Sequence, residues 1–365
     1  MKRLTLGDVC KKASSNIAQK DLQDKIGAYP IYGASGLIKQ VDFYQQDKEY
    51  IAVVKDGAGI GRTMLLPAYS SVIGTMQYLL PKEGIPIDIK YLFYAVEHMN
   101  LAKYFSGATI PHIYFKDYQK EPINIPDIDT QRKISRIFDK IDALIISRKE
   151  QRTRLDQIVK SRFIEMFGDP VDNPHGFRKV ALSELAEIRI GPFGSLLHKE
   201  DYIEGGHPLL NPSHIVDGKV APDSKLTISD KKYDELEAYH LHTGDVVMGR
   251  RGEMGRCAVV PSEGFLCGTG SLLIRTKGEV TADYIQKTIS FPSFRKTIED
   301  MAVGQTMPNL NVPIVSKFQI IKPPIEVQIN YYKFVAQTDK SKLAIQKSLE
   351  KLEILKKSLM QKYFG

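Results

Sequence analysis

The sequence has few of the residues that mark a metal, redox or membrane protein. Its three cysteines, Cys10, Cys257 and Cys267, form neither a CxxC pair nor a zinc-ligand spacing. We therefore expect buried, reduced thiols and a cytoplasmic location. No apolar run approaches the roughly 20 residues that cross a bilayer, so we expect no membrane partner.

Motifs that support catalysis are also missing. Residues 56–61 look like a nucleotide-binding loop, but their spacing is GxGxG and a short strand follows where that mechanism needs a helix. Residues 222–223 with 230–232 are similar to a nuclease signature, but their spacing is short. Residues 211–214 begin like an amino-methyltransferase motif and lack its second proline and aromatic residue. The eight histidines show no HExxH pattern. We predict no catalytic residue, no metal ligand and no directly bound cofactor.

The most informative feature is an internal repeat. Residues 107–168 recur as residues 304–365 without a gap, at an offset of 197. Upstream, residues 62–67 match residues 256–261 at an offset of 194. The second copy carries insertions, the largest between about Val216 and Gly249. Such a duplicated domain gives a pseudo-symmetric molecule, which suits a two-part ligand such as two segments of duplex DNA.

Both repeat tails are predicted to be long helices, at residues 127–168 and 324–365. Asp129 or Thr130 can cap the first helix, and a Phe-Gly pair ends each one. Apolar residues recur at spacings of three and four, which is typical of a coiled-coil seam. These positions are Ile134, Ile137, Ile141, Leu144, Leu155 and Ile158 in the first tail and Tyr331, Phe334, Ile345, Leu349, Leu352, Leu355 and Leu359 in the second. We expect the two helices to pack antiparallel, although two separate surface helices remain an alternative.

The remaining segments indicate an α+β protein with two β-rich domains, at residues 1–126 and 177–323, joined by a linker at residues 169–176. Matching strands are expected in the two copies, and helical periodicity covers residues 88–103 and 282–301. The expected strands are 49–54, 63–66 and 78–80 in the first copy and 245–248, 257–260 and 272–275 in the second.

Charge alone says little about the partner. The net charge is +8 and the pI is about 9.0, which permits nucleic-acid binding. Most of the excess lies on the tails, and residues 169–323 carry 18 basic and 20 acidic side chains. Any DNA-binding surface of this segment must therefore be a local patch, for which we predict Arg250, Arg251 and Arg256.

Two kinds of loop are candidates for contact with DNA. The strand-connecting loops around residues 55–62 and 249–256 have a basic rim, and the loops at residues 107–112 and 304–309 precede the long helices. A purely structural turn and a phosphate or base contact remain open for both. The candidate DNA-binding residues are Lys55, Arg62, Thr109, His112, Arg250, Arg251, Arg256, Thr306 and Asn309.

Together these segments resemble the specificity (S) subunit of type I restriction–modification systems, and the resemblance covers the whole chain. The short motifs that carry it are Tyr29–Gly36, Ile190–Ser195, His242–Val246 and the two Pro-x-Ile-x-x-Gln helix starts at Pro126–Gln131 and Pro323–Gln328. Their order and duplication make the match specific.

The resemblance implies two target-recognition domains, each of which reads one half of an asymmetric bipartite site on double-stranded DNA. The long helices would set the spacer and dock modification (methyltransferase) subunits, two by analogy. Adenine methylation with SAM would belong to those subunits, and ATP- and Mg²⁺-dependent translocation and cleavage to restriction subunits. A self-sufficient methyltransferase or nuclease with its own recognition module is the alternative function, and a protein scaffold without a DNA role is a third.

Overall fold

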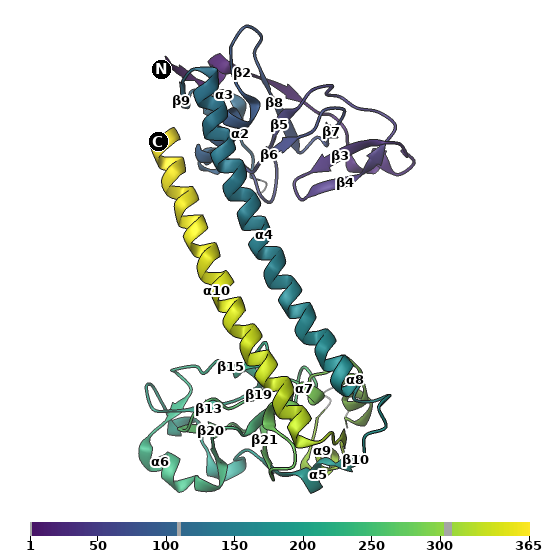
Figure 1. Cartoon of the computed structure of the whole chain (residues 1–365). Helices are drawn as coiled ribbons and strands as arrows, with labels where there is room; N and C mark the ends of the chain where they lie inside the picture. Colours follow the sequence, from purple (N-terminus) through teal and green to yellow (C-terminus); the bar gives the residue numbers. More distant parts are fainter. Residues whose placement is uncertain (1, 108–110, 303–308) are drawn as a thin grey trace. The chain divides into compact units, whose positions relative to one another are not determined.

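Two long helices, α4 (Ile128–Phe167) and α10 (Ile325–Phe364), are each shared between two structural units. The computed structural model describes residues 2–107, 111–302 and 309–365. Unit 1 comprises Met1–Arg152 and Ala344–Gly365, and unit 2 comprises Thr153–Leu343. Each unit therefore contains one β-rich region together with one segment of each long helix (Figure 1).

Unit 1 is built on a four-stranded antiparallel sheet of order β2-β8-β5-β6. Its central strand β5 is buried along its whole length, and α2 packs beside it (Figure 1). A three-stranded sheet β4-β3-β7 and a pair β1-β9 complete the unit. The elements are β1 Lys2–Thr5, α1 Leu6–Val9, β2 Cys10–Ser14, β3 Tyr29–Gly33, β4 Gly36–Val41, β5 Tyr50–Val54, β6 Thr63–Leu66, β7 Ser71–Val72, β8 Met76–Pro81, α2 Ile89–His98, α3 Phe115–Tyr118 and β9 Pro122–Ile125.

Unit 2 repeats this plan with additions. Its four-stranded sheet has the order β11-β21-β18-β19 and its strand pair is β10-β22. Between β13 and β18 it has β14, β15, β16, α6 and β17, where unit 1 has only β4 between β3 and β5. The elements are β10 Lys179–Ala181, α5 Leu182–Leu185, β11 Ala186–Ile190, β12 Tyr202–Ile203, β13 His207–Leu210, β14 Ile215–Val216, β15 Lys219–Val220, β16 Thr227–Ile228, α6 Asp230–Glu235, β17 His240–Leu241, β18 Val246–Gly249, β19 Cys257–Val259, β20 Phe265–Cys267, β21 Ser271–Thr276, α7 Ala282–Ile289, α8 Pro292–Met301, α9 Val312–Ser316 and β22 Gln319–Ile321. The predicted α+β fold class with long helices is confirmed.

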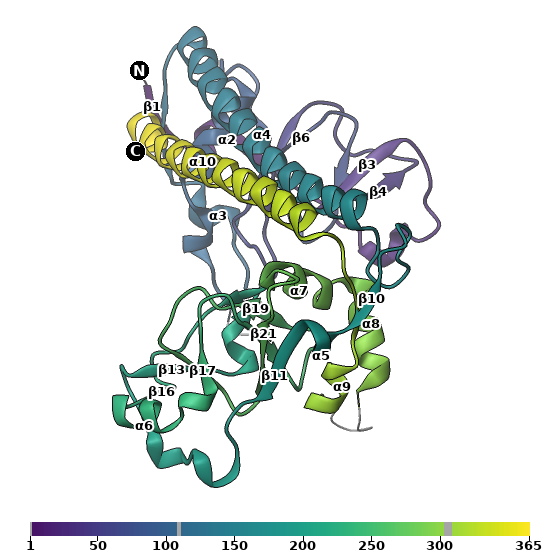
Figure 2. The ribbon, with the colours of Figure 1, turned by 60° about the horizontal axis from the view of Figure 1, so that its bottom comes forward.

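Within each unit, the two long helices contribute to one hydrophobic core. In unit 1, Phe138 and Met360 lie in the cluster that also holds Tyr91. Asp142 forms an ion pair with Lys356, and Arg152 donates a hydrogen bond to Gln346. From the first contact to the second, the residue number rises by ten on α4 and falls by ten on α10. These segments are therefore antiparallel. In unit 2, α7 lies between the four-stranded sheet and the ends of the long helices (Figure 2).

The coiled-coil seam is narrower than the sequence predicts. Ile134 and Ile141 are buried, whereas Leu144 and Ile158 are 47% and 49% exposed. On α10, Leu349 is buried and Leu355 is 46% exposed. An α-helix has 3.6 residues per turn, so apolar residues spaced by three and four spread over a face that is wider than the contact with one partner helix. Some of them are therefore exposed. Both helices therefore keep apolar side chains on their outer surface.

Two predicted helix features are wrong in detail. The first long helix begins at Ile128, and its cap is Asp127, whose carboxylate accepts hydrogen bonds from the amide and hydroxyl of Thr130 at 2.9 and 2.7 Å. Residues 282–301 form two helices, because Pro292 cannot donate the hydrogen bond that a continuous helix needs and instead starts α8.

A buried glutamine joins the start of each long helix to the N-terminal cap of an earlier helix, α2 in the first copy and α7 in the second. Gln131 accepts a hydrogen bond from the Asp88 amide at 2.9 Å, and Gln328 accepts one from the Thr281 amide at the same distance. Each also donates to a proline carbonyl at the entry to its own helix, at 2.9 Å. Both glutamines are fully buried. This duplicated contact explains the conspicuous glutamine of the Pro-x-Ile-x-x-Gln motif.

We predict that Gln328→Leu destabilises unit 2. The leucine fills similar space but leaves the Thr281 amide and the Pro323 carbonyl without partners, at about 1–3 kcal/mol for each buried group. Urea unfolding followed by circular dichroism measures this. Gln337→Leu, at an exposed position of the same helix, is the control and should change little. Equal stability of the two variants would show that the buried contact contributes nothing.

Candidate nucleic-acid interface

In both copies the loop after the central strand meets the loop that precedes the long helix. In the first copy, Asp56 forms a backbone bridge with His112, and the Ile113 amide donates to the Lys55 carbonyl at 3.0 Å. In the second, Arg251 forms a bridge with Asn309, and the Leu310 amide donates to the Arg250 carbonyl at 3.0 Å. We call this pair of joined loop segments the loop frame; it comprises residues 55–56 and 112–113 in the first copy and residues 250–251 and 309–310 in the second. The loop frame holds two polar residues at its bridge in each unit.

The two copies fill this frame with different chemistry. In the first copy, His112 Nδ1 contacts the Asp56 carboxylate, whose other oxygen lies 3.3 Å from Lys55 Nζ. The His112 ring also lies 4.1 Å from the ring of Tyr114. Lys55 and His112 therefore both contact the same carboxylate. The first copy thus combines a carboxylate, an imidazole and an ammonium group at this place.

The second copy presents donors instead. Arg250 is partly buried, and its Nε donates to the Leu310 carbonyl at 3.1 Å. Burial, together with the neighbouring Arg251, lowers the pKa of Arg250. Arg251 is exposed and makes no side-chain hydrogen bond or ion pair with any described residue. Asn309 Oδ1 is buried and finds no hydrogen-bond partner in the described part of the chain. Within the described residues, the Arg251 guanidinium is therefore without a side-chain partner.

Two further predicted residues, Arg62 and Arg256, lie on the same hairpins, and their side chains are already engaged. Arg62 Nη1 donates to the Ala34 carbonyl at 2.9 Å. Arg256 is held by the Glu253 carboxylate at 2.7 Å, and the same carboxylate receives Arg295 at 2.6 Å. Arg256 is therefore less available to a ligand than Arg251. Thr109 and Thr306 lie outside the described residues.

The glycine-rich loop at residues 56–61 is a hairpin between β5 and β6. Gly57, Gly59 and Gly61 all have φ between +77° and +86°, which favours glycine. A Cβ on Gly61 would lie 2.3 Å from the backbone nitrogen of Ala102. The glycines are thus explained by turn geometry and by close packing, and no helix follows that could hold a phosphate.

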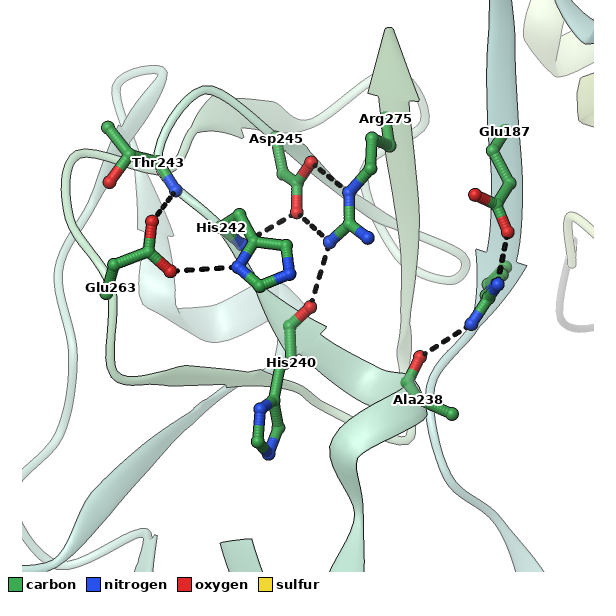
Figure 3. Close-up of polar contacts among 9 residues, drawn as sticks. Glu187, Ala238, His240, His242, Thr243, Asp245, Glu263 and Arg275 are labelled. Atoms are coloured by element: carbon green, nitrogen blue, oxygen red, sulfur yellow. Dashed lines mark hydrogen bonds and ion pairs between the residues drawn. The ribbon is translucent and has the colours of Figure 1, made fainter. Parts of the chain in front are cut away.

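One cluster escaped sequence reasoning, although it surrounds the His242–Val246 motif. Asp245, with a side chain only 4% exposed, receives two hydrogen bonds from Arg275 at 2.9 and 2.7 Å (Figure 3). Arg275 also donates to the His240 carbonyl, and the His242 amide donates to Asp245. The Asp245–Arg275 pair joins the turn before β18 to β21. The two residues are 30 positions apart, so predicting their contact requires knowing how β18 and β21 are aligned.

A neighbouring carboxylate fixes the same turn. Glu263 accepts hydrogen bonds from the Thr243 amide at 2.8 Å and from the His242 ring at 2.9 Å (Figure 3). The Thr243 amide and then the His242 side chain lower the pKa of Glu263 to about 2. The motif is therefore a hydrogen-bonded turn that leads directly into β18 and the Arg250–Arg251 loop that follows it.

No group of three or more His, Cys, Asp or Glu side chains that could hold a metal ion occurs among residues 2–107, 111–302 and 309–365. Within those same ranges, no helix combines the length and the apolar character that crossing a membrane requires.

Comparison with known proteins decides the family. The model of the type I restriction modification DNA specificity domain matches twice, at residues 1–157 and 174–356. The chain belongs to this family. The resemblance stated from the sequence is thereby confirmed, and the two matches coincide with the two copies of the internal repeat.

Individual relatives of this specificity family agree. The specificity subunit of the type I restriction enzyme MjaVIII from Methanocaldococcus jannaschii is 20% identical over 331 residues, which are 85% of this chain and 77% of that protein. The EcoprrI specificity subunit from Escherichia coli is 28% identical over 149 residues, 39% of this chain and 36% of that protein.

Solved structures share the fold. The S subunit of a type I restriction–modification system from M. genitalium has a TM-score of 0.62 at 15% identity, covering 100% of this chain and 96% of that chain. A chain from a structure that addresses complex assembly and conformational transition of the type I R-M system has a TM-score of 0.61 at 16% identity, covering 100% and 97%.

Proposed function

We propose that this specificity-family chain recognises an asymmetric, two-part DNA site, with residues 1–126 reading one half and residues 177–323 the other. The observation that carries this proposal is the duplicated loop frame. The same backbone bridge and the same amide-to-carbonyl hydrogen bond join the two loops in both copies, while the side chains are Asp56 and His112 in one and Arg251 and Asn309 in the other. Since bases are distinguished by donor and acceptor placement in the major groove, these frames should select different bases.

Arg251 is the residue that we expect to read a base in the second half-site. A guanidinium can donate two hydrogen bonds to the O6 and N7 of guanine, which is the commonest specific contact in the major groove. The neighbouring Arg250 is held by the Leu310 carbonyl and supports the loop. Lys55, Arg62 and Arg256 are assigned to phosphate or structural contacts, which position the domain without reading sequence.

The long helices are proposed to set the spacer between the half-sites and to dock modification subunits, two because the surface is duplicated. Their exposed apolar side chains support this role. They include Leu144, Ile158, Ile354 and Leu355, which are between 46% and 68% exposed. Methylation with SAM would take place on those subunits, and ATP- and Mg²⁺-dependent cleavage on restriction subunits, in the cytoplasm.

The test of base reading is Arg251→Ala. If Arg251 contacts guanine, the change should weaken specific binding by about 1–3 kcal/mol and relax a single position of the second half-site. Methylated adenines are mapped in DNA from cells that express the variant together with its modification subunit. Arg178→Ala removes the same charge from an exposed position of the same domain and should leave the recognised sequence unchanged. An unaltered site in the Arg251 variant would remove Arg251 from recognition.

A further inference from the structure

A polar cavity of about 520 Å³ lies in unit 2 beneath the β14–β15 hairpin. The hairpin belongs to the insertion of the second copy, and it turns at Asp217-Gly218, both in the left-handed region, as a tight two-residue hairpin requires. Lys219 on the hairpin, Arg256 after the β18–β19 loop, Lys287 on α7 and Arg295 on α8 line the cavity. Two carboxylates, Asp217 and Glu253, also line it, so cations are in excess.

The Glu253 carboxylate already forms ion pairs with two arginines. Glu253 receives Arg256 at 2.7 Å and Arg295 at 2.6 Å, and hydrogen bonds from these two arginines lower the pKa of Glu253. It therefore has little capacity left to neutralise the lysines. Glu253 instead holds both guanidinium groups in place at the cavity wall.

Three donors at the cavity wall find no acceptor among the residues that the structure describes. The Nε of Arg295 is buried and has no hydrogen-bond partner in the part of the chain that the structure describes. Buried donors are nearly always paired, so an orphan calls for an explanation such as an absent ion. Within the described residues, the lysine amines of Lys219 and Lys287 also make no ion pair. Burial, and then the nearby Lys160 and Lys342, lower the pKa of Lys287, which an anion would relieve.

Two features of this cavity are not repeated in the described part of the first copy. Lys287 lies six residues after the α7 cap Thr281, and the residue six positions after the matching α2 cap Asp88 is Tyr94. Tyr94 bonds the carboxylates of Asp139 and Asp142 at 3.0 and 3.2 Å. Unit 1 also lacks the β14–β15 hairpin. Lys287 and the hairpin that carries Lys219 are thus specific to the second copy.

We propose that this cavity binds a phosphate group of the DNA backbone and so fixes the second domain on its half-site. The inference rests on the proposed function. Residues 169–323 carry 18 basic and 20 acidic side chains, so their net charge does not attract DNA. The cavity instead gathers four cationic side chains at one place, where a single phosphodiester could bind. Phosphate contacts of this kind set register and orientation without reading the base.

The experiment measures binding of the full chain to a mixed-sequence duplex as the salt concentration increases. Each phosphate contact adds about 0.9 to the slope of log affinity against log salt. Lys219→Gln, Lys287→Gln and the double variant are compared with wild type. Lys225→Gln is the control, because it removes the same charge from an exposed position of the same insertion outside the cavity.

The proposal expects the double variant to lose about one unit of slope while Lys225→Gln keeps the wild-type slope. Equal slopes in the double variant and the control would overturn it and leave the proposed function intact. If inorganic phosphate raises the melting temperature of wild type more than that of the double variant while the slopes agree, the cavity holds free phosphate and the DNA assignment is wrong. A wild-type chain that binds no duplex would reject the proposed function and this inference together.

Discussion

Phe163→Ala should destabilise unit 2 by about 3–5 kcal/mol, the cost of removing a fully buried phenylalanine from a packed core. The ring of Phe163 is fully buried, and its centroid lies 5.0 Å from that of Phe167 and 5.5 Å from those of Phe291 and Tyr331. Removing it leaves a void between α4, α7 and α10, which these aromatic residues cannot fill without leaving their own positions.

The effect is large because a domain has only about 5–15 kcal/mol of net stability. Urea unfolding gives the free energy, and soluble yield gives a second readout. Ile158→Ala, at a half-exposed position of the same helix, is the control and should fall within about 0.5 kcal/mol of wild type. A loss below 1 kcal/mol in the Phe163 variant would mean that α4 does not share the core of this unit.

Lengthening both helices should change the recognised spacer and leave both half-sites unaltered. One heptad is inserted between Ser147 and Arg148 and another between Glu350 and Lys351. These junctions face each other, since Asp142 pairs with Lys356 on one side and Arg152 with Gln346 on the other. A heptad keeps the apolar pattern in register and adds about 10 Å of helix, which corresponds to about three base pairs of DNA.

The measurement for this insertion is the map of methylated adenines, read for the length of the non-specific spacer. An insertion in α4 alone is the control, because it shifts the two helices out of register and should abolish methylation. If the matched variant methylates DNA with the original spacer, the helices do not act as the ruler.

The sequence allowed the duplicated architecture to be predicted because repetition is visible without knowing any contact. The matching strands, the long helices and the linker all follow from pattern and from proline and glycine positions. Helix caps and breaks are harder to predict, as Asp127 and Pro292 show, because neighbouring residues compete for the same terminal position. These errors concern single residues and leave the order of elements intact.

The features that escaped prediction depend on contacts between distant segments. The Asp245–Arg275 pair needs the register of β18 against β21, and the loop frames need Asp56 to meet His112 across the intervening fold. The Asp217-Gly218 dipeptide could have indicated a hairpin, but its position over a cationic cavity could not be inferred. Local pattern thus predicts elements, while sites arise from how the elements meet.

The most direct test of the central claim is the map of methylated adenines in DNA from cells that express this chain with its modification subunit, compared with cells that lack the chain. We expect a single motif made of two unlike half-sites separated by a fixed number of unspecified bases, and no such methylation without the chain. Methylation that is independent of the chain, or confined to one continuous motif, would contradict a protein that reads DNA with two different domains.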